Sequence, residues 1–438
     1  MTGLKRHMGL GALLIYGVGD MLGAGIYGLV GKAAGLMGHL VWLGFLGAML
    51  AAVFTGLSYA CLGSRYPKAA GAAYVTGRAW GMPFLTWLVG LTVAASGLTS
   101  MATGSRVIAG YLQKFGLAVD TVPLAIGTLL LVAGVVYRGI RESTWMNAIC
   151  TGVELTGILI VIGVTLPYWG TVSLVQPPQP DMDGFDLFRL TMQGAVLTFF
   201  AFVGFEDLLN VAEEAKNPER DLPLALVGAI AIATVLYMAV AIGAVNVLPT
   251  AALAASKAAL VDVVAAAAPA IPPQLFTGIG IFAVANTALL NLIMGSRLLY
   301  GMSKQGLLPA VIGRIHPVRQ TPHVAIAVLL GIVILLMLTA DIDHLAAATS
   351  LLLLSAFVVV NLSLVVLMLR PGEAKGGFEV PLPVPILGAL ICGALIVARV
   401  LDPAADVRAP TIAGVVLLVL AGLFFVARPK GSVEELLG

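Results

Sequence analysis

Long apolar runs, separated by short polar or Pro- and Gly-containing breaks, follow one another along the whole sequence. A run of about 20 apolar residues is long enough to cross a hydrocarbon core roughly 30 Å thick as a helix. Counting such runs predicts about twelve membrane-spanning helices, with approximate ranges 10–33, 38–63, 82–113, 121–138, 145–169, 189–211, 223–248, 274–303, 322–340, 343–369, 382–401 and 409–427. The Ala-rich stretch 250–272 contains Lys257 and Asp262 and is predicted to form an external hairpin or lid.

Glycine interrupts the middle of two predicted spans. Span 1 contains GVGDMLGAGIYG, residues 17–28, and span 6 contains FFAFVGFEDLLN, residues 199–210, with Gly204. Glycine in a helix interior costs up to about 1 kcal/mol relative to alanine, so both segments favour opening of the helix. Such a pair of interruptions, in corresponding positions of two halves, points to a midplane binding site in inverted-repeat transporters. The alternative is that the glycines only allow close helix packing.

The backbone of two opened helices also predicts what a site between them binds. A half-helix that starts near Ala24 presents free N–H groups and a positive dipole end, which favour a carboxylate. Unwound carbonyls near Met21, Phe200 and Val203 can accept hydrogen bonds from an ammonium group. An α-amino acid satisfies both requirements, and Phe200 and Phe202 are expected to close over it.

Composition excludes several other classes of protein. Of the 438 residues, 60% are hydrophobic and 11% are charged, whereas a soluble domain has about 25% charged residues. The three cysteines, Cys61, Cys150 and Cys392, have no spacing that suits a zinc site or a disulfide framework. The sequence has no GxSxG, HExxH or GxxxxGK[ST] motif, so we expect neither an enzyme nor an ATP-driven pump.

Basic residues predict the orientation, because Lys and Arg are retained in cytoplasmic loops. With the N-terminus inside, the inner segments hold Lys5, Arg6, Arg65, Lys68, Arg78, Arg138, Arg141, Lys216, Arg220, Lys304, Arg314, Arg319, Arg370, Lys375, Arg428 and Lys430. The outer segments hold fewer basic residues, namely Lys32, Lys114, Arg189, Lys257, Arg399 and Arg408. Both termini are therefore expected in the cytoplasm.

Several segments resemble the amino acid–polyamine–organocation (APC) family of transporters. The string GDMLGAGIYG, residues 19–28, is similar to the glycine-rich signature of the family, and residues 199–225 resemble its sixth span and the loop that follows. Residues 64–81 resemble its first inner loop, and residues 286–309 resemble its eighth span. The resemblance covers most of residues 10–310 and does not specify a substrate.

The resemblance implies an all-α membrane protein with a LeuT-like fold, in which helices 1 and 6 are broken. The whole chain, residues 1–438, would form a single transporter domain. It would consist of two inverted five-span repeats, residues 10–169 and 189–369, and two additional C-terminal helices in residues 382–427. The resemblance also implies substrate contacts at Met21, Gly23, Ala24, Gly25, Phe200, Val203 and Gly204, with Asn291 facing the substrate side chain.

Acidic residues inside the spans are candidates for coupling transport to an ion. A charge at the bilayer centre costs at least about 2.5–3.5 kcal/mol, so such residues are functional candidates by default. Four acids qualify, namely Asp20, Glu154, Glu206 and Asp207. Many APC relatives have a lysine in span 5, where this sequence has Glu154. We predict proton-coupled uptake with Glu154 as the leading coupling residue, followed by Glu206 or Asp20; alternatively, Asp20 only bonds freed amides and Asp207 only faces the inner water layer.

Sodium is the alternative coupling ion. The carbonyls of Gly19 and Leu22, the Thr287 hydroxyl and the Glu154 carboxylate are hard oxygen ligands that suit Na⁺. Apart from H⁺ or Na⁺, we expect no cofactor and no metal.

The predicted function is secondary active transport of an amino acid across the inner (plasma) membrane by alternating access. The candidate pocket residues Ser96, Gly97, Ala195 and Phe200 are small or apolar, which favours a neutral amino acid, although a cationic one could use Glu206. The expected partners are this substrate and membrane lipid, with no nucleic acid and no obligate protein partner. Alternatives are sodium symport, exchange of amino acids or polyamines, and a non-transporting amino acid receptor.

Overall fold

The computed structural model describes residues 8–66, 71–138, 144–209, 212, 215–304, 308–319, 321–403 and 405–427. Within these ranges the chain is helical, and its only strand-like pairing is an isolated bridge between Met8 and Ala215. The all-helical prediction is therefore confirmed. Some residues used above to predict orientation and span 6 lie outside the described residues, namely Lys5, Arg6, Lys68, Arg141, Asn210, Arg428 and Lys430.

The helices follow the predicted ranges closely. The α-helices are α1 (Leu10–Met21), α2 (Ala24–Met37), α3 (Val41–Arg65), α4 (Gly71–Trp80), α5 (Pro83–Lys114), α6 (Thr121–Arg138), α7 (Thr144–Thr165), α8 (Gly184–Phe199), α9 (Pro218–Val247), α10 (Thr250–Ala255), α11 (Ala259–Ala267), α12 (Pro273–Lys304), α13 (His323–Thr339), α14 (Ile342–Leu369), α15 (Pro383–Val400) and α16 (Arg408–Ala427). Short 3₁₀ segments are η1 (Gly38–Leu40), η2 (Leu166–Tyr168), η3 (Phe200–Phe202) and η4 (Phe205–Leu209).

Length and composition make 10 helices of the described chain suitable for crossing a membrane, and one of the 10 is the stretch Ala24–Arg65. Two shorter apolar helices, α1 and α13, accompany them. The predicted hairpin 250–272 contains the two short helices α10 and α11.

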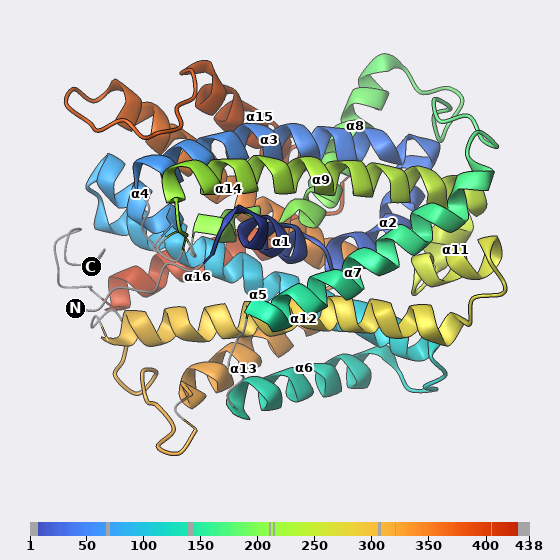
Figure 1. The fold of residues 1–438 in the computed structure, drawn as a ribbon, viewed down its shortest axis with the longest axis horizontal. Helices are drawn as coiled ribbons and strands as arrows, with labels where there is room; N and C mark the ends of the chain where they lie inside the picture. The colour runs from blue at the N-terminus through green and yellow to red at the C-terminus, as the bar shows by residue number, and fades with distance from the viewer. Residues whose placement is uncertain are drawn as a thin grey trace.

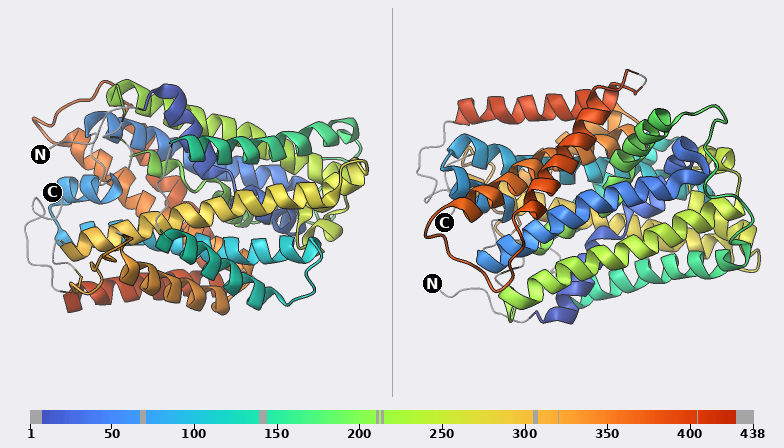
Figure 2. Two further views of the ribbon diagram at one scale, coloured as in Figure 1. Left: turned by 60° about the horizontal axis from the view of Figure 1, so that its bottom comes forward. Right: turned by 90° about the horizontal axis from the view of Figure 1, so that it is seen from above.

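The long helices run side by side along the longest axis of the molecule, as Figures 1 and 2 show. The short helix α1 packs against α7 and α9, and the views of Figure 2 show it at the edge of the bundle, where Leu10 and Ile15 are exposed. Helix α5 packs against α12 and α14. A broken helix thus packs against continuous ones.

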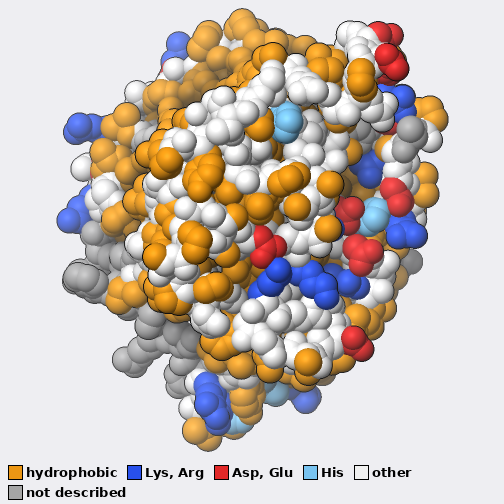
Figure 3. Space-filling view, turned by 90° about the vertical axis from the view of Figure 1, so that its right-hand side faces the viewer, with side chains coloured by type: hydrophobic (Ala, Val, Ile, Leu, Met, Phe, Trp, Pro, Cys, Tyr) orange, Lys and Arg blue, Asp and Glu red, His pale blue; other side chains and the backbone are white. Residues whose placement is uncertain are grey.

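The outer surface carries apolar side chains that a soluble protein would bury. Leu131 on α6 is 68% exposed, Val235 on α9 is 68% exposed, and Leu418 on α16 is 74% exposed. Large exposed apolar areas mark contact with another apolar phase. Long helices satisfy their own backbone hydrogen bonds, so that phase can be lipid. Charged side chains instead gather on the end of the bundle that faces the viewer in Figure 3. This is the end that carries α11, where Lys114 pairs with Asp262.

Candidate functional site

The first interruption lies between α1 and α2. Leu22 is extended (φ −70°, ψ 143°), and Gly23 has φ 138°, a conformation that side-chain-bearing residues rarely adopt. Space also requires glycine here, because a Cβ on Gly23 would lie 2.2 Å from the Thr287 hydroxyl oxygen. The first hydrogen bond of α2 runs from the Tyr27 amide to the Gly23 carbonyl at 3.1 Å. The amides of the first turn, including Ala24 and Gly25, precede that bond and have no acceptor within the helix.

The second interruption divides the predicted span 189–211. Helix α8 tightens into η3, the chain becomes extended at Val203 (φ −60°, ψ 133°), and Gly204 has φ 122° before η4 begins. Short 3₁₀ segments and an extended residue release backbone groups from the regular helical pattern. Both glycine-containing spans are thus non-helical at their glycines.

The two interruptions touch each other. A Cβ on Gly204 would lie 2.8 Å from the Asp20 carbonyl carbon and oxygen, and a Cβ on Gly25 would lie 2.4 Å from the Ala201 Cα. Only hydrogen in place of a side chain permits this approach at either glycine. The end of α1 therefore packs on Gly204, and the start of α2 packs on η3.

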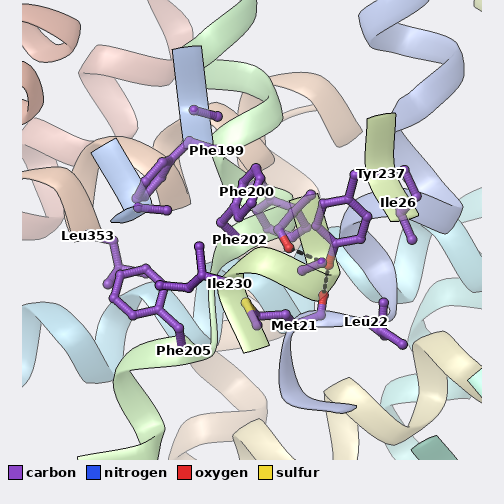
Figure 4. Packing of buried hydrophobic residues seen from close by; sticks show 14 of the residues in the cluster. Met21, Leu22, Ile26, Phe199, Phe200, Phe202, Phe205, Ile230, Tyr237 and Leu353 are labelled. Carbon is purple, nitrogen blue, oxygen red and sulfur yellow. Dashed lines mark hydrogen bonds between the residues drawn. The ribbon is translucent and has the colours of Figure 1, made fainter. Parts of the chain in front are cut away.

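Tyr237 on α9 joins the two interruptions from a third helix. Its hydroxyl lies 2.7 Å from the Met21 carbonyl oxygen and 2.8 Å from the Ala201 carbonyl oxygen (Figure 4). A hydroxyl carries a single proton, so it donates to one carbonyl at a time. The side chain is fully buried, and its position connects unwound backbone on both broken helices.

A cavity of about 40 Å³ lies between the interruptions and α5. Its lining comes from four parts of the chain: Asp20, Met21, Leu22, Ala24, Gly25, Val93, Ser96, Gly97, Ser100, Phe200, Val203, Gly204, Glu206, Asp207, Thr287 and Asn291. One water-sized sphere needs about 10–15 Å³ on this measure, so the space suits a small group of atoms.

Most of the predicted substrate contacts line this cavity. Met21, Ala24, Gly25, Phe200, Val203, Gly204 and Asn291 are all in its wall, together with Ser96 and Gly97. Gly23 is not in the wall, although its backbone makes the turn into α2. The Asn291 amide donates to the Thr287 carbonyl at 3.0 Å within α12.

Two pocket residues considered from the sequence lie elsewhere. Phe202 was expected to close over the substrate, but its ring packs edge-on against Tyr237 with the centroids 5.3 Å apart. Ala195 is fully buried on α8 and contacts Gly47 of α3 instead of the cavity. On a continuous helix Phe200 and Phe202 point in different directions, and η3 keeps that difference, so only Phe200 reaches the cavity.

Glu206 is held by the backbone of the second interruption. One of its carboxylate oxygens accepts a hydrogen bond from the Gly204 amide at 3.0 Å, and the residue is 6% exposed. It therefore satisfies a donor that the broken helix releases, as an N-cap carboxylate does.

Asp20 and Asp207 face the same cavity from different segments. Their carboxyl groups lie within hydrogen-bonding reach of each other, and both residues are only half-buried. The second carboxyl oxygen of Asp20, Oδ2, has no hydrogen-bond partner among the described residues. The sequence had left the role of Asp207 open. A charged residue in the middle of an apolar run was the signal that it faces the site.

Glu154 lies outside the cavity wall, on α7. The residue is fully buried, and one carboxyl oxygen accepts a hydrogen bond from the Asn286 amide at 3.1 Å. The other oxygen, Oε2, has no partner within the described part of the chain. The backbone carbonyl of Glu154 accepts from the Tyr27 hydroxyl at 2.7 Å, which connects α7 to the first turns of α2.

The four predicted sodium ligands are divided between two places. Leu22 and Thr287 line the cavity. Gly19 packs against α7, where an added Cβ would lie 1.9 Å from the Thr151 hydroxyl oxygen, and Glu154 bonds to Asn286. In the described ranges, no group of three or more His, Cys, Asp or Glu side chains is placed to hold a metal ion.

Three cavity residues were missed or left without a role by the sequence. Val93 and Ser100 share one wall with Ser96, because positions three and four apart on α5 lie on the same face. Asp207 is the third. Helical spacing from Ser96, which the sequence did suggest, is the signal that could have identified Val93 and Ser100.

The chain is similar to known amino acid permeases over most of its length. A family model described as "Amino acid permease" matches residues 9–423. The chain is 30% identical over 416 residues to the branched-chain amino acid permease BcaP of Bacillus subtilis, covering 89% of this chain and 87% of that protein.

Two further relatives carry other names. A methylthioribose transporter of Bacillus subtilis is 29% identical over 427 residues, with 89% of this chain and 87% of that protein covered. Cationic amino acid transporter 4 of Mus musculus is 31% identical over 402 residues, with 84% of this chain and 60% of that protein covered. These relatives are transporters that are named for different substrates.

Proposed function

Because this chain belongs to the amino acid permease family, and is therefore a multi-pass membrane transporter and not an enzyme, we propose that it moves an amino acid by secondary active transport. The observation that carries the proposal is the shared cavity between the two interrupted helices. Free amides of the first turn of α2 suit the carboxylate of the cargo. Carbonyls released near Met21 and Val203 suit its ammonium group.

We propose a LeuT-like architecture for this transport. Residues 10–169 and 189–369 form the two inverted repeats, and residues 382–427 add two helices. The support is that the interruption after α1 and the interruption after α8 occur in the first span of each half, where broken helices build midplane sites in inverted-repeat transporters. Rocking of one helix group around the fixed cavity then provides alternating access.

The preferred cargo in this proposal is a small neutral amino acid. A volume of about 40 Å³ leaves little room beyond a zwitterion. The wall opposite the interruptions is formed by the small residues Ser96, Gly97 and Ser100 of α5. A Cβ on Gly97 would lie 2.7 Å from the Asn291 carboxamide oxygen, so these two residues define the side-chain end of the cavity. A larger cargo requires α5 and α12 to separate.

We further propose that a proton drives uptake and that Glu154 is the leading coupling residue, with Asp20 and Glu206 as the next candidates. Glu154 is fully buried. Within the described residues, its side chain accepts one hydrogen bond, from the neutral side-chain amide of Asn286. A buried carboxylate with so little compensation is costly, and binding a proton removes the charge. Its carbonyl contact with Tyr27 gives it a mechanical link to α2.

Sodium remains the second candidate for the coupling ion. Leu22 and Thr287 both line the cavity, and the Leu22 carbonyl and the Thr287 hydroxyl are the oxygen ligands that this alternative would use. Glu154 and Gly19 would need to approach them for a complete site.

Uptake into proteoliposomes tests these proposals. Purified protein is reconstituted, and uptake of labelled alanine is measured with an inward proton gradient, with an inward sodium gradient, and with neither. We expect the proton gradient to accelerate wild-type uptake and to accelerate uptake by Glu154→Gln clearly less. Glu219→Gln, at an exposed acid on the first turn of α9, is the control and should respond as the wild type does. Uptake that requires sodium at fixed pH would overturn proton coupling.

We place the protein in the plasma membrane with both termini in the cytoplasm. Arg65, Arg78 and Arg370 form ion pairs with Glu379 and Glu373 of the connection between α14 and α15, so these basic side chains lie at one end of the bundle. Basic residues are retained on the cytoplasmic side, which supports this orientation. Impermeant thiol labelling of single cysteines in that connection, in intact cells, should give no signal until the cells are opened.

A further inference from the structure

Three carboxyl groups share the cavity wall, and no positive side chain of the described residues accompanies them. Asp20, Glu206 and Asp207 line the space, and none of the described lining residues is Lys, Arg or His. An uncompensated carboxylate in a membrane interior is energetically unfavourable. The cavity therefore needs positive charge from somewhere other than the protein's own side chains.

Glu206 differs from the two aspartates because the backbone compensates it. Its carboxylate, which belongs to η4, accepts a hydrogen bond from the Gly204 amide at 3.0 Å. Peptide donors at a helix start stabilise a carboxylate. The unmet demand for positive charge therefore lies with Asp20 and Asp207.

The two aspartates already require one proton between them. Their carboxyl groups lie within hydrogen-bonding reach, and an ionised carboxylate can only accept hydrogen bonds, so one partner must be protonated for the bond to form. Asp20 Oδ2 has no partner in the described structure. Both residues are half-buried and border the cavity, so a charged group of the cargo can replace the proton.

The titratable groups that surround the pair supply no cation. Glu206 on η4 and Glu154 on α7 add negative character, while Tyr59 on α3 and Tyr237 on α9 are buried phenols. The elements packed against α1 are α9, α7 and η4. From none of them does a described basic side chain line the cavity.

We propose that the Asp20–Asp207 pair is a site for one positive charge, which a proton supplies when the cargo is neutral and the side-chain cation supplies when the cargo is dibasic. The inference rests on the proposed transport function and names what its cavity recognises. The loaded cavity then carries the same net charge with either cargo. Glu154 can hold a further proton without changing this balance.

Transport of two cargoes separates the sources of the charge. Labelled alanine and labelled lysine are offered to proteoliposomes containing the wild type, Asp20→Asn, Asp207→Asn or the control Asp181→Asn, at an exposed acid. For the wild type, we expect an inward proton gradient to accelerate alanine uptake more than lysine uptake, because only alanine needs the proton of the pair. In Asp207→Asn, the gradient should accelerate alanine uptake less than it does in the wild type, and lysine uptake should fall at least tenfold.

A spectroscopic measurement tests the pair without any transport. Infrared difference spectra of the purified proteins, recorded in H₂O and D₂O, should show a protonated-carboxyl band that weakens in both Asn variants and not in Asp181→Asn. Absence of transport in the wild type together with this band would reject the transport function and retain the shared proton. The inference is overturned if Asp207→Asn keeps the wild-type band, or if its uptake of both cargoes matches the wild type.

Discussion

The hydroxyl of Tyr237 offers the sharpest test of whether the two interruptions act as one unit. It bridges the carbonyls of Met21 and Ala201 at 2.7 and 2.8 Å. Replacing Tyr237 with Phe keeps the ring, which packs on Phe45 and Phe202, and removes only the bridge. The change therefore affects the connection between the broken helices with little effect on the volume of the core.

The magnitude follows from the count of hydrogen bonds. One proton serves two carbonyls, so the variant loses one donor and leaves one buried acceptor unsatisfied, which costs about 1–3 kcal/mol. If this energy stabilises the state in which the interruptions are joined, its loss shifts the balance towards a separated state by about 5- to 150-fold.

Hydrogen exchange measures that shift directly. We expect faster amide exchange in residues 17–28 and 199–209 of Tyr237→Phe, with unchanged exchange in the continuous helix α14. Tyr111→Phe is the matched control for residues 199–209, because its buried hydroxyl donates to a backbone carbonyl of the first interrupted segment alone, that of Tyr27 at 2.9 Å. Equal exchange in Tyr237→Phe and the wild type, or the same acceleration of residues 199–209 in Tyr111→Phe, would refute the reasoning.

Two further predictions concern Gly204, in the second interruption, and Glu373, in the connection between α14 and α15. Gly204→Ala should reduce uptake at least tenfold while circular dichroism shows unchanged helix content, because φ is 122° and a Cβ would lie 2.8 Å from Asp20 backbone atoms; wild-type uptake would contradict the contact. Burial alone would raise the pKa of Glu373, but hydrogen bonds from Tyr66 and Arg78 hold that pKa below its usual value. Its stabilising contribution is therefore present above the ordinary glutamate pKa of about 4.3 and is lost as pH falls through the lower folded-state pKa. Thermal unfolding of Glu373→Gln should differ most from the wild type at pH 7, and a difference that grows on acidification would contradict this sign.

Local sequence was sufficient to predict the helices and their interruptions. Runs of apolar residues set the span lengths, since a hydrocarbon layer imposes one length on every crossing helix. Gly23 and Gly204 could mark the interruptions because glycine, which has no Cβ, tolerates the positive φ that both adopt. For the same reason the wall residues on the interruptions, such as Met21 and Phe200, could be named in advance.

The tertiary structure decided what the buried acids contact. Glu206 and Asp207 are neighbours in the sequence, yet one accepts the Gly204 amide and the other reaches Asp20. Glu154, an equally plausible candidate by burial cost, bonds Asn286 outside the cavity wall.

Tyr237 shows most clearly what only the fold determines. It lies 216 positions from Met21 in the sequence, and its hydroxyl reaches that carbonyl only once α9 has packed beside the interruptions. A glycine conformation is local and therefore readable from the chain, whereas the partner of a carboxyl or hydroxyl group depends on which helices the folded bundle brings together.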